Sequence, residues 1–255
     1  MQFSANLGFL WTDLPLPEAI RAAKAAGFDA VECHWPYDVP TDVTRAALTE
    51  TGLPMLGLNT RKGDPAAGEN GLSALPGREA EARAAIDEAL DYAVATATRN
   101  VHVMAGVAQG DAARRTFLSN LAHACDRAAD HGITILIEPL NPHDAPGYYL
   151  SDTALAADLI DAAGRPNLKL MFDCYHVGRT EGDVLGRLKV LLPMVGHVQF
   201  AGVPDRGPPD RGTLDYGAVF AGIRDLGWDR PLGAEYRPGG ATEPTLDWMT
   251  DLRPA

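Results

Sequence analysis

Short apolar runs alternate along the chain with longer Ala-rich segments of helical period. The runs predict strands at Phe3–Leu7, Ala30–His34, Met55–Leu58, Val101–Met104, Thr134–Glu138, Leu168–Asp173, His197–Phe200 and Leu232–Glu235. The periodic segments predict helices at Pro15–Ala26, Val43–Thr51, Arg78–Ala97, Ala112–His131, Asp152–Ala163, Asp183–Leu192, Tyr216–Leu226 and Thr245–Asp251. A helix after every strand implies parallel pairing. The pattern predicts a single-domain (β/α)8 TIM barrel over residues 1–255, with an open doubly wound sheet as the alternative.

Two connections are long and irregular, Asn59–Gly77 and Gly202–Asp215. Both follow predicted strands, so in a barrel both lie on the carboxyl-terminal face. Long loops without secondary structure are often lids or binding loops, and a mobile surface insertion is the alternative.

Composition and charge narrow the class of partner. The formal net charge is −12, which repels phosphate backbones and anionic lipid, so we expect a small-molecule substrate and neither nucleic acid nor membrane. No GxGxxG follows the first strand and no GxxxxGK[ST] occurs, which disfavours dinucleotide and P-loop functions. The three cysteines Cys33, Cys125 and Cys174 are far apart, and the amino terminus has no signal-peptide pattern, so a reducing cytoplasm is expected. A homo-oligomer is compatible with the sequence.

Each of the last four predicted strands ends in or carries a side chain that offers an oxygen: Glu138, Asp173, Gln199 and Glu235. Carboxylates are rarely buried without a partner, and three of them at adjacent strand ends would repel one another. A divalent cation resolves this conflict, and an all-oxygen set suits Mg²⁺ or Mn²⁺ better than zinc. The alternative is that each acid caps a helix or pairs with an arginine.

Four further side chains are candidates for substrate binding. His176 follows Asp173 by three residues, and it could bind substrate, support a ligand or be a satisfied loop histidine. His102 lies inside a strand, where a packed core histidine is equally compatible. Arg206 could clamp a carboxylate through two hydrogen bonds, and Arg211 in the same loop is its rival.

At these residues the chain resembles the hydroxypyruvate isomerase family, within the xylose-isomerase-like barrels. The matching stretches are Gly63–Glu79, Asn100–Gly106, Ile135–Leu150, Asp173–His176, Gly196–Arg206 and Gly233–Pro238. The resemblance implies that Glu138, Asp173, Gln199 and Glu235 ligate the metal and that the two glutamates are the acid/base pair. Sugar epimerases of the same superfamily usually have histidine at the position of Gln199, so the glutamine favours the hydroxypyruvate isomerase branch.

The resemblance implies the conversion of hydroxypyruvate to tartronate semialdehyde, with a 2-oxo-tetronate isomerase or a ketose 3-epimerase as alternatives. Departures from the family pattern lie in substrate-facing loops. Gly207, Pro208 and Thr213 replace an expected histidine and two expected acids, and His143 stands where arginine is common. These changes bear on the substrate and leave the metal chemistry intact. A metal-dependent endonuclease on the same barrel and a non-enzymatic binding module are less favoured classes.

Overall fold

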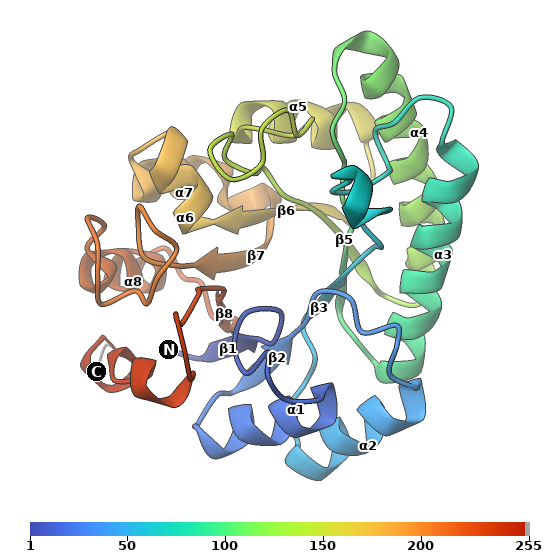
Figure 1. Ribbon diagram of the computed structural model, residues 1–255. Coiled ribbons are helices and arrows are strands. Elements are labelled where there is room, and N and C mark those ends of the chain that lie inside the picture. Colours follow the sequence, from blue (N-terminus) through green and yellow to red (C-terminus); the bar gives the residue numbers. More distant parts are fainter. Residues whose placement is uncertain (253–255) are drawn as a thin grey trace.

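Eight parallel strands form one barrel in the computed structural model, which describes residues 1–252 (Figure 1). The strands are β1 (Phe3–Asn6), β2 (Ala30–Glu32), β3 (Gly57–Asn59), β4 (Asn100–His102), β5 (Thr134–Ile137), β6 (Leu168–Asp173), β7 (Val195–Phe200) and β8 (Leu232–Ala234). Their order is β2-β1-β8-β7-β6-β5-β4-β3, and a parallel bridge between Val31 and Met55 brings β2 beside β3. The barrel prediction is confirmed, and the open-sheet alternative is wrong.

The helices cover the outside of the barrel (Figure 1). Those that match predicted segments are α1 (Leu16–Ala25), α2 (Thr41–Thr51), α3 (Glu79–Thr96), α4 (Gly110–Ala129), α5 (Thr153–Ala163), α7 (Val184–Leu191), α8 (Tyr216–Asp225) and α9 (Trp248–Asp251). Short 3₁₀ turns are η1 (Pro65–Ala67), η2 (Leu192–Met194) and η3 (Glu243–Thr245). Among residues 1–252, no helix has both the length and the apolar character needed to cross a bilayer.

One helix was missing from the prediction. Helix α6 (Cys174–Thr180) begins directly after β6, because the Asp173 side chain accepts a hydrogen bond from the Tyr175 amide at 2.8 Å and caps it. Seven residues are too few to show a helical period in the sequence. Two helices, α6 and α7, therefore follow β6 where one was expected.

An aromatic cluster fastens the last helices to the barrel. Phe3 of β1 packs edge-on against Trp248 of α9 with ring centroids 5.0 Å apart. Phe200 of β7 packs in the same way against Phe220 of α8 at 4.9 Å. All four rings are fully buried, and burial of such side chains stabilises the fold by about 1.5–3 kcal/mol each. The strand ends that carry the polar candidates thus belong to a rigid frame.

Both long loops are ordered by contacts with the frame. In the first, Gly71 pairs with Ala105 beyond β4, and its φ of 113° together with the Met104 carbonyl 2.7 Å from an added Cβ leaves room only for glycine. In the second, the Arg237 amide beyond β8 donates to the Arg206 carbonyl at 2.7 Å, and within the loop the Gly202 amide donates to the Gly207 carbonyl at 2.7 Å. This turn brings Arg206 to the mouth.

Candidate active site

The four oxygen-bearing candidates lie together at the carboxyl ends of neighbouring strands. Asp173 ends β6 and is paired in register with Gln199 of β7, while Glu138 and Glu235 follow β5 and β8 directly. All four are buried, with no more than 5% of any residue exposed. His102 ends β4 and is 3% exposed. The structure thus places these side chains at the same barrel mouth, and their roles as ligands or catalytic groups stay predictions.

On the β5–β6 side of the mouth, Glu138, Asp173 and His176 place ligand atoms within 4.8 Å of one another, a spacing that could hold a metal ion. His176 Nε2 lies 3.8 Å from Glu138 Oε1 and 3.7 Å from Asp173 Oδ2. His176 Nδ1 accepts a hydrogen bond from the Asn141 amide at 2.9 Å. A backbone N–H can only donate, so in a neutral ring the proton is on Nε2.

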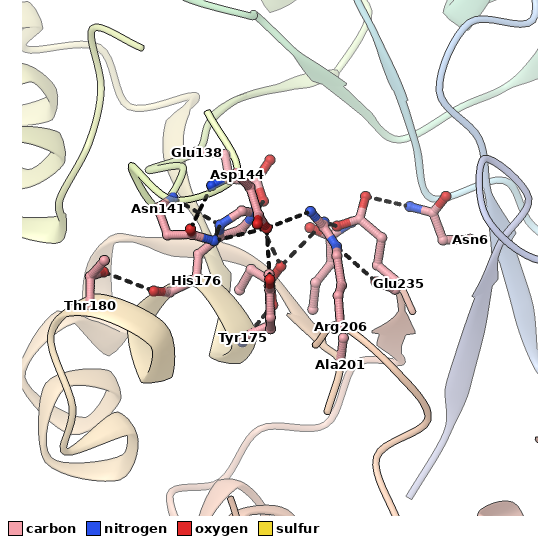
Figure 2. A network of polar contacts seen from close by, with 12 residues as sticks. Asn6, Glu138, Asn141, Asp144, Tyr175, His176, Thr180, Ala201, Arg206 and Glu235 are labelled. Atoms are coloured by element: carbon pink, nitrogen blue, oxygen red, sulfur yellow. Dashed lines mark hydrogen bonds and ion pairs between the residues drawn. The ribbon is translucent and has the colours of Figure 1, made fainter. Parts of the chain in front are cut away.

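His176 is neutral at physiological pH, since burial and then the Arg206 charge lower its pKa to about 3. Its Nε2 therefore presents an N–H between the two carboxylates. This favours hydrogen-bond donation over metal ligation among the roles that the sequence left open. His176 belongs to α6, and the unpredicted helix is what turns its ring into the site (Figure 2).

Several buried polar atoms at this mouth have no hydrogen-bond partner. Among the described residues they include Glu138 Oε1, Asp173 Oδ2, Gln199 Oε1, His176 Nε2 and both ring nitrogens of His102. An unsatisfied buried acceptor costs about 1–3 kcal/mol, and more when it is charged. Three such oxygens, two of them from carboxylates, form a donor set that fits a hard divalent cation. The residues present therefore fit the metal that the family resemblance implies.

On the β8 side, Glu235 has polar partners on several sides (Figure 2). Its carboxylate accepts hydrogen bonds from Asn6 Nδ2 at 2.9 Å and from Arg206 Nη2, and His34 Nε2 lies at 3.0 Å. The Arg206 guanidinium lies over the ring of Phe9 at 4.8 Å, and Nη1 lies 4.0 Å from Asp144, beyond hydrogen-bond distance. Nη1 is thus available to a substrate carboxylate.

The two glutamates have opposite electrostatic surroundings. Burial, and then the charges of Glu235 and Asp173, raise the pKa of Glu138 well above its ordinary value. Burial also acts to raise the pKa of Glu235, but Arg206 and His34 outweigh it and lower the pKa to about 2. Burial raises the pKa of Asp173 to about 7, against the opposing effect of Arg206. Arg206 is therefore a positive partner of the acids within the chain itself.

The structure separates the two rival arginines. Arg206 is 9% exposed and contacts the acids, whereas the Arg211 side chain is 68% exposed and faces Asp210. Sequence reasoning missed Asn6, Glu32 and His34, which support the site from the ends of β1 and β2 and from the segment after β2. The signal that identified the later acids, a polar residue where an apolar run ends, also marks Asn6 and Glu32.

Comparison with known proteins agrees with this architecture. The model of the xylose isomerase-like TIM barrel family matches residues 20–252. A Cupriavidus necator protein named 2-oxo-tetronate isomerase is 43% identical, with 97% of each chain covered. The Escherichia coli hydroxypyruvate isomerase is 34% identical over 99% of this chain and 100% of its own length.

A solved structure from Brucella melitensis, named AP endonuclease, family 2, superposes with a TM-score of 0.94. It has 39% identity and 99% of each chain is covered. With a family model over most of the chain and full-length relatives well above 30% identity, the assignment is secure. This chain belongs to the xylose isomerase-like TIM barrel family, among isomerases whose members include hydroxypyruvate isomerase and 2-oxo-tetronate isomerase.

Proposed function

We propose that this chain isomerises a small 2-keto acid with a hydroxyl on carbon 3, converting hydroxypyruvate to tartronate semialdehyde. The observation that carries the proposal is the pair Glu138 and Glu235, two buried carboxylates of one barrel mouth with opposite surroundings. Proton transfer between adjacent carbons needs one carboxylate that accepts a proton and one that delivers it. The relatives named hydroxypyruvate isomerase and 2-oxo-tetronate isomerase support the same reaction class.

Glu138, Asp173, Gln199 and Glu235 would hold a divalent cation, Mg²⁺ or Mn²⁺. The unpartnered oxygens of the first three support this assignment. When bound, such a cation supplies positive charge that stabilises the enediolate oxygens. Glu235 is included as the fourth ligand because the family resemblance implies it, although both of its oxygens already contact Asn6, His34 and Arg206 within the chain.

In the forward direction, Glu235 removes the proton from carbon 3 and Glu138 delivers a proton to carbon 2, while the hydroxyl proton passes from oxygen 3 to oxygen 2. The donors Arg206, Asn6 and His34 favour the ionised form of Glu235. Burial of Glu138, together with the charges of Glu235 and Asp173, favours its protonated form. The roles exchange in the reverse direction.

Three side chains orient the substrate in this proposal. Arg206 Nη1 binds the substrate carboxylate, since among residues 1–252 it has only a 4.0 Å ion pair with Asp144, while Nη2 is already engaged by Glu235. His176 donates its Nε2 hydrogen to a substrate oxygen between Glu138 and Asp173. His102 Nδ1 lies 3.7 Å from Glu138 and lines the same space.

A 2-oxo-tetronate is the second candidate, favoured by the relative of that name at 43% identity. It undergoes the same transfer from carbon 3 to carbon 2 and differs only in a hydroxymethyl group on carbon 3. The same residues would serve both substrates, and the reaction would be the same. The two substrates would therefore be distinguished by their relative turnover rates.

A substrate panel tests the proposal. Chelator-treated protein is assayed, before and after addition of Mg²⁺ or Mn²⁺, with hydroxypyruvate, 2-oxo-tetronates, a free ketose and a DNA duplex that contains an abasic site. We expect turnover of the two acids only after metal addition. Elemental analysis that finds no metal in a fully active enzyme would contradict the metal assignment. Epimerisation of the ketose or cleavage of the duplex in place of acid turnover would overturn the proposed reaction.

A further inference from the structure

Glu32 is a buried carboxylate that has no part in the proposed proton transfer. It ends β2 and is 3% exposed. Its Oε2 lies 2.6 Å from Nε2 of His197, and its Oε1 accepts hydrogen bonds from Gln199 Nε2 at 3.3 Å and from Asn6 Nδ2 at 3.5 Å. Glu32 thus joins a β7 histidine to two amides that face the active site.

The barrel interior is shaped around this carboxylate. In the strand order, β1 and β8 separate β2 from β7, so the Glu32 side chain must cross the interior to reach His197 and Gln199. Gly233 of β8 lies on this path. A Cβ added there would lie 2.3 Å from Glu32 Oε1 and 2.8 Å from Gln199 Cγ. The missing side chain is what permits the contact between Glu32 and Gln199.

The chemistry of the contact fixes the orientation of an amide. Gln199 has a donor end and an acceptor end, whereas an ionised carboxylate only accepts. The Nε2 of Gln199 must therefore face Glu32, and its Oε1 must face away. That oxygen is buried and has no hydrogen-bond partner in the part of the chain that the structure describes.

Asn6 is oriented by a different contact. Its Oδ1 accepts from the Gly8 amide at 2.9 Å, which directs its Nδ2 toward Glu235 without help from Glu32. Glu32 therefore sets the orientation of the Gln199 amide and is not needed for that of Asn6.

We propose that Glu32, anchored by His197, is a positioning residue that presents the Gln199 oxygen to the divalent cation. The inference rests on the proposed function in one respect, the role of Gln199 as a ligand. Partners of metal ligands fix ligand orientation, and their loss typically lowers metal affinity about 10–100-fold. Glutamine at position 199 can present either end of its amide, and the Glu32 carboxylate selects the orientation in which the oxygen faces away from β2.

The test is a Mn²⁺ titration of chelator-treated full-length protein, in which free Mn²⁺ is measured by its electron paramagnetic resonance signal. Glu32→Met removes the acceptor at nearly constant volume, and we expect affinity to fall about 10–100-fold. Glu32→Gln keeps an oxygen that can accept from Gln199, so it should recover part of the loss. A purely structural role for Glu32 would instead lower the free energy of unfolding of Glu32→Met without lowering its Mn²⁺ affinity.

A double variant separates this route from others. Gln199→Ala should weaken binding, and Glu32→Met should then have no further effect in the Gln199→Ala background. Thr98→Val is the matched control, because it removes a buried hydrogen bond to Thr96 at the opposite end of β4. Its Mn²⁺ affinity should equal that of the unmodified protein.

The outcomes distinguish the inference from the function it rests on. If Gln199→Ala weakens binding and Glu32→Met does not, or if their effects multiply, the positioning role is wrong and the metal site stands. If the unmodified protein does not bind Mn²⁺, or Gln199→Ala binds as well as it does, the proposed ligand set is wrong. Should Glu32→Met not fold, His197→Leu tests the same anchor: reduced affinity supports the role, and unchanged affinity overturns it.

Discussion

On the β8 side of the barrel mouth Glu235 is contacted by an arginine, a histidine and an amide. On the β5–β6 side Glu138 and Asp173 each keep one buried oxygen that has no hydrogen-bond partner among the described residues. Both sides are equally removed from solvent. The difference therefore lies in the partners that the chain supplies and not in burial.

This contrast shows how one barrel can provide two kinds of carboxylate. Where donors converge, the ionised form is stabilised by the protein itself, and the pKa of Glu235 falls to about 2. Where they do not, burial dominates and the pKa of Asp173 rises to about 7. On the β5–β6 side Arg206 offsets only part of the cost of burial, so a bound cation should stabilise the ionised carboxylates most on that side.

Exchange of each glutamate for glutamine should have the largest and most unequal effects. Glu235→Gln leaves the buried Arg206 without its main anion, and breaking a buried pair in this way costs about 3–5 kcal/mol of unfolding free energy. Glu138→Gln replaces a carboxyl group whose ionised form is disfavoured by burial and by the charges of Glu235 and Asp173, so the metal-free protein should be at least as stable as the unmodified one. Urea unfolding of chelator-treated protein measures both.

Turnover should fall in both variants by about 10²-fold or more, because each glutamate has a role in acid–base catalysis. Glu50→Gln is the control: it breaks an exposed pair with Arg21, which should change stability by less than about 1 kcal/mol. Equal destabilisation by Glu138→Gln and Glu235→Gln would remove the contrast between the two sides, and near-normal turnover of either variant would refute the catalytic pair.

The pH dependence of stability in the metal-free protein should show the two sides acting in opposite directions. The folded-state pKa of Asp173 is about 7 against an ordinary 3.8, so its contribution is fully present below pH 3.8 and is lost as pH rises toward 7. The folded-state pKa of Glu235 is about 2 against an ordinary 4.5, so its contribution is present above pH 4.5 and is lost as pH falls toward 2.

Thermal unfolding across pH 2–8 tests this with one variant for each limb. Asp173→Asn removes the titrating group, so the loss of stability between pH 3.8 and 7 (the alkaline limb) should become smaller. Asparagine can still cap α6, so the variant should fold. Glu235→Gln should likewise reduce the loss of stability below pH 4.5 (the acid limb). Added Mn²⁺ should also flatten the alkaline limb in the unmodified protein, because carboxylates bind metal in their deprotonated form. If Asp173→Asn leaves the alkaline limb unchanged, the burial of this acid is not the cause.

Strand and helix periodicity was sufficient to predict the barrel, because the apolar runs that form its strands are buried on both faces and stand out from the Ala-rich helices. The acids at the ends of β5, β6 and β8 could be recognised in the sequence because each of them ends one of these apolar runs. Helix α6 was not, and neither was the supporting role of Glu32. A carboxylate that crosses the barrel to reach β7 depends on Gly233, which is distant in sequence and shows no local pattern.

The smallest effects should come from two histidines that differ in whether they have a partner. His34→Phe keeps the ring that packs edge-on against Phe9 at 5.1 Å but removes the contact with Glu235 at 3.0 Å. A hydrogen bond to a charged group contributes about 1.5–3 kcal/mol, so His34→Phe should lower the free energy of unfolding by about that amount.

His102→Phe removes two ring nitrogens that have no hydrogen-bond partner among the described residues. Burial lowers the pKa of His102 to about 4 and keeps its ring neutral. The free energy of unfolding of this variant should therefore change by less than about 1.5 kcal/mol. Urea unfolding of the metal-free variants measures the difference, and a larger loss for His102→Phe than for His34→Phe would show that the β5–β6 side is held by contacts of His102, which would reverse the contrast.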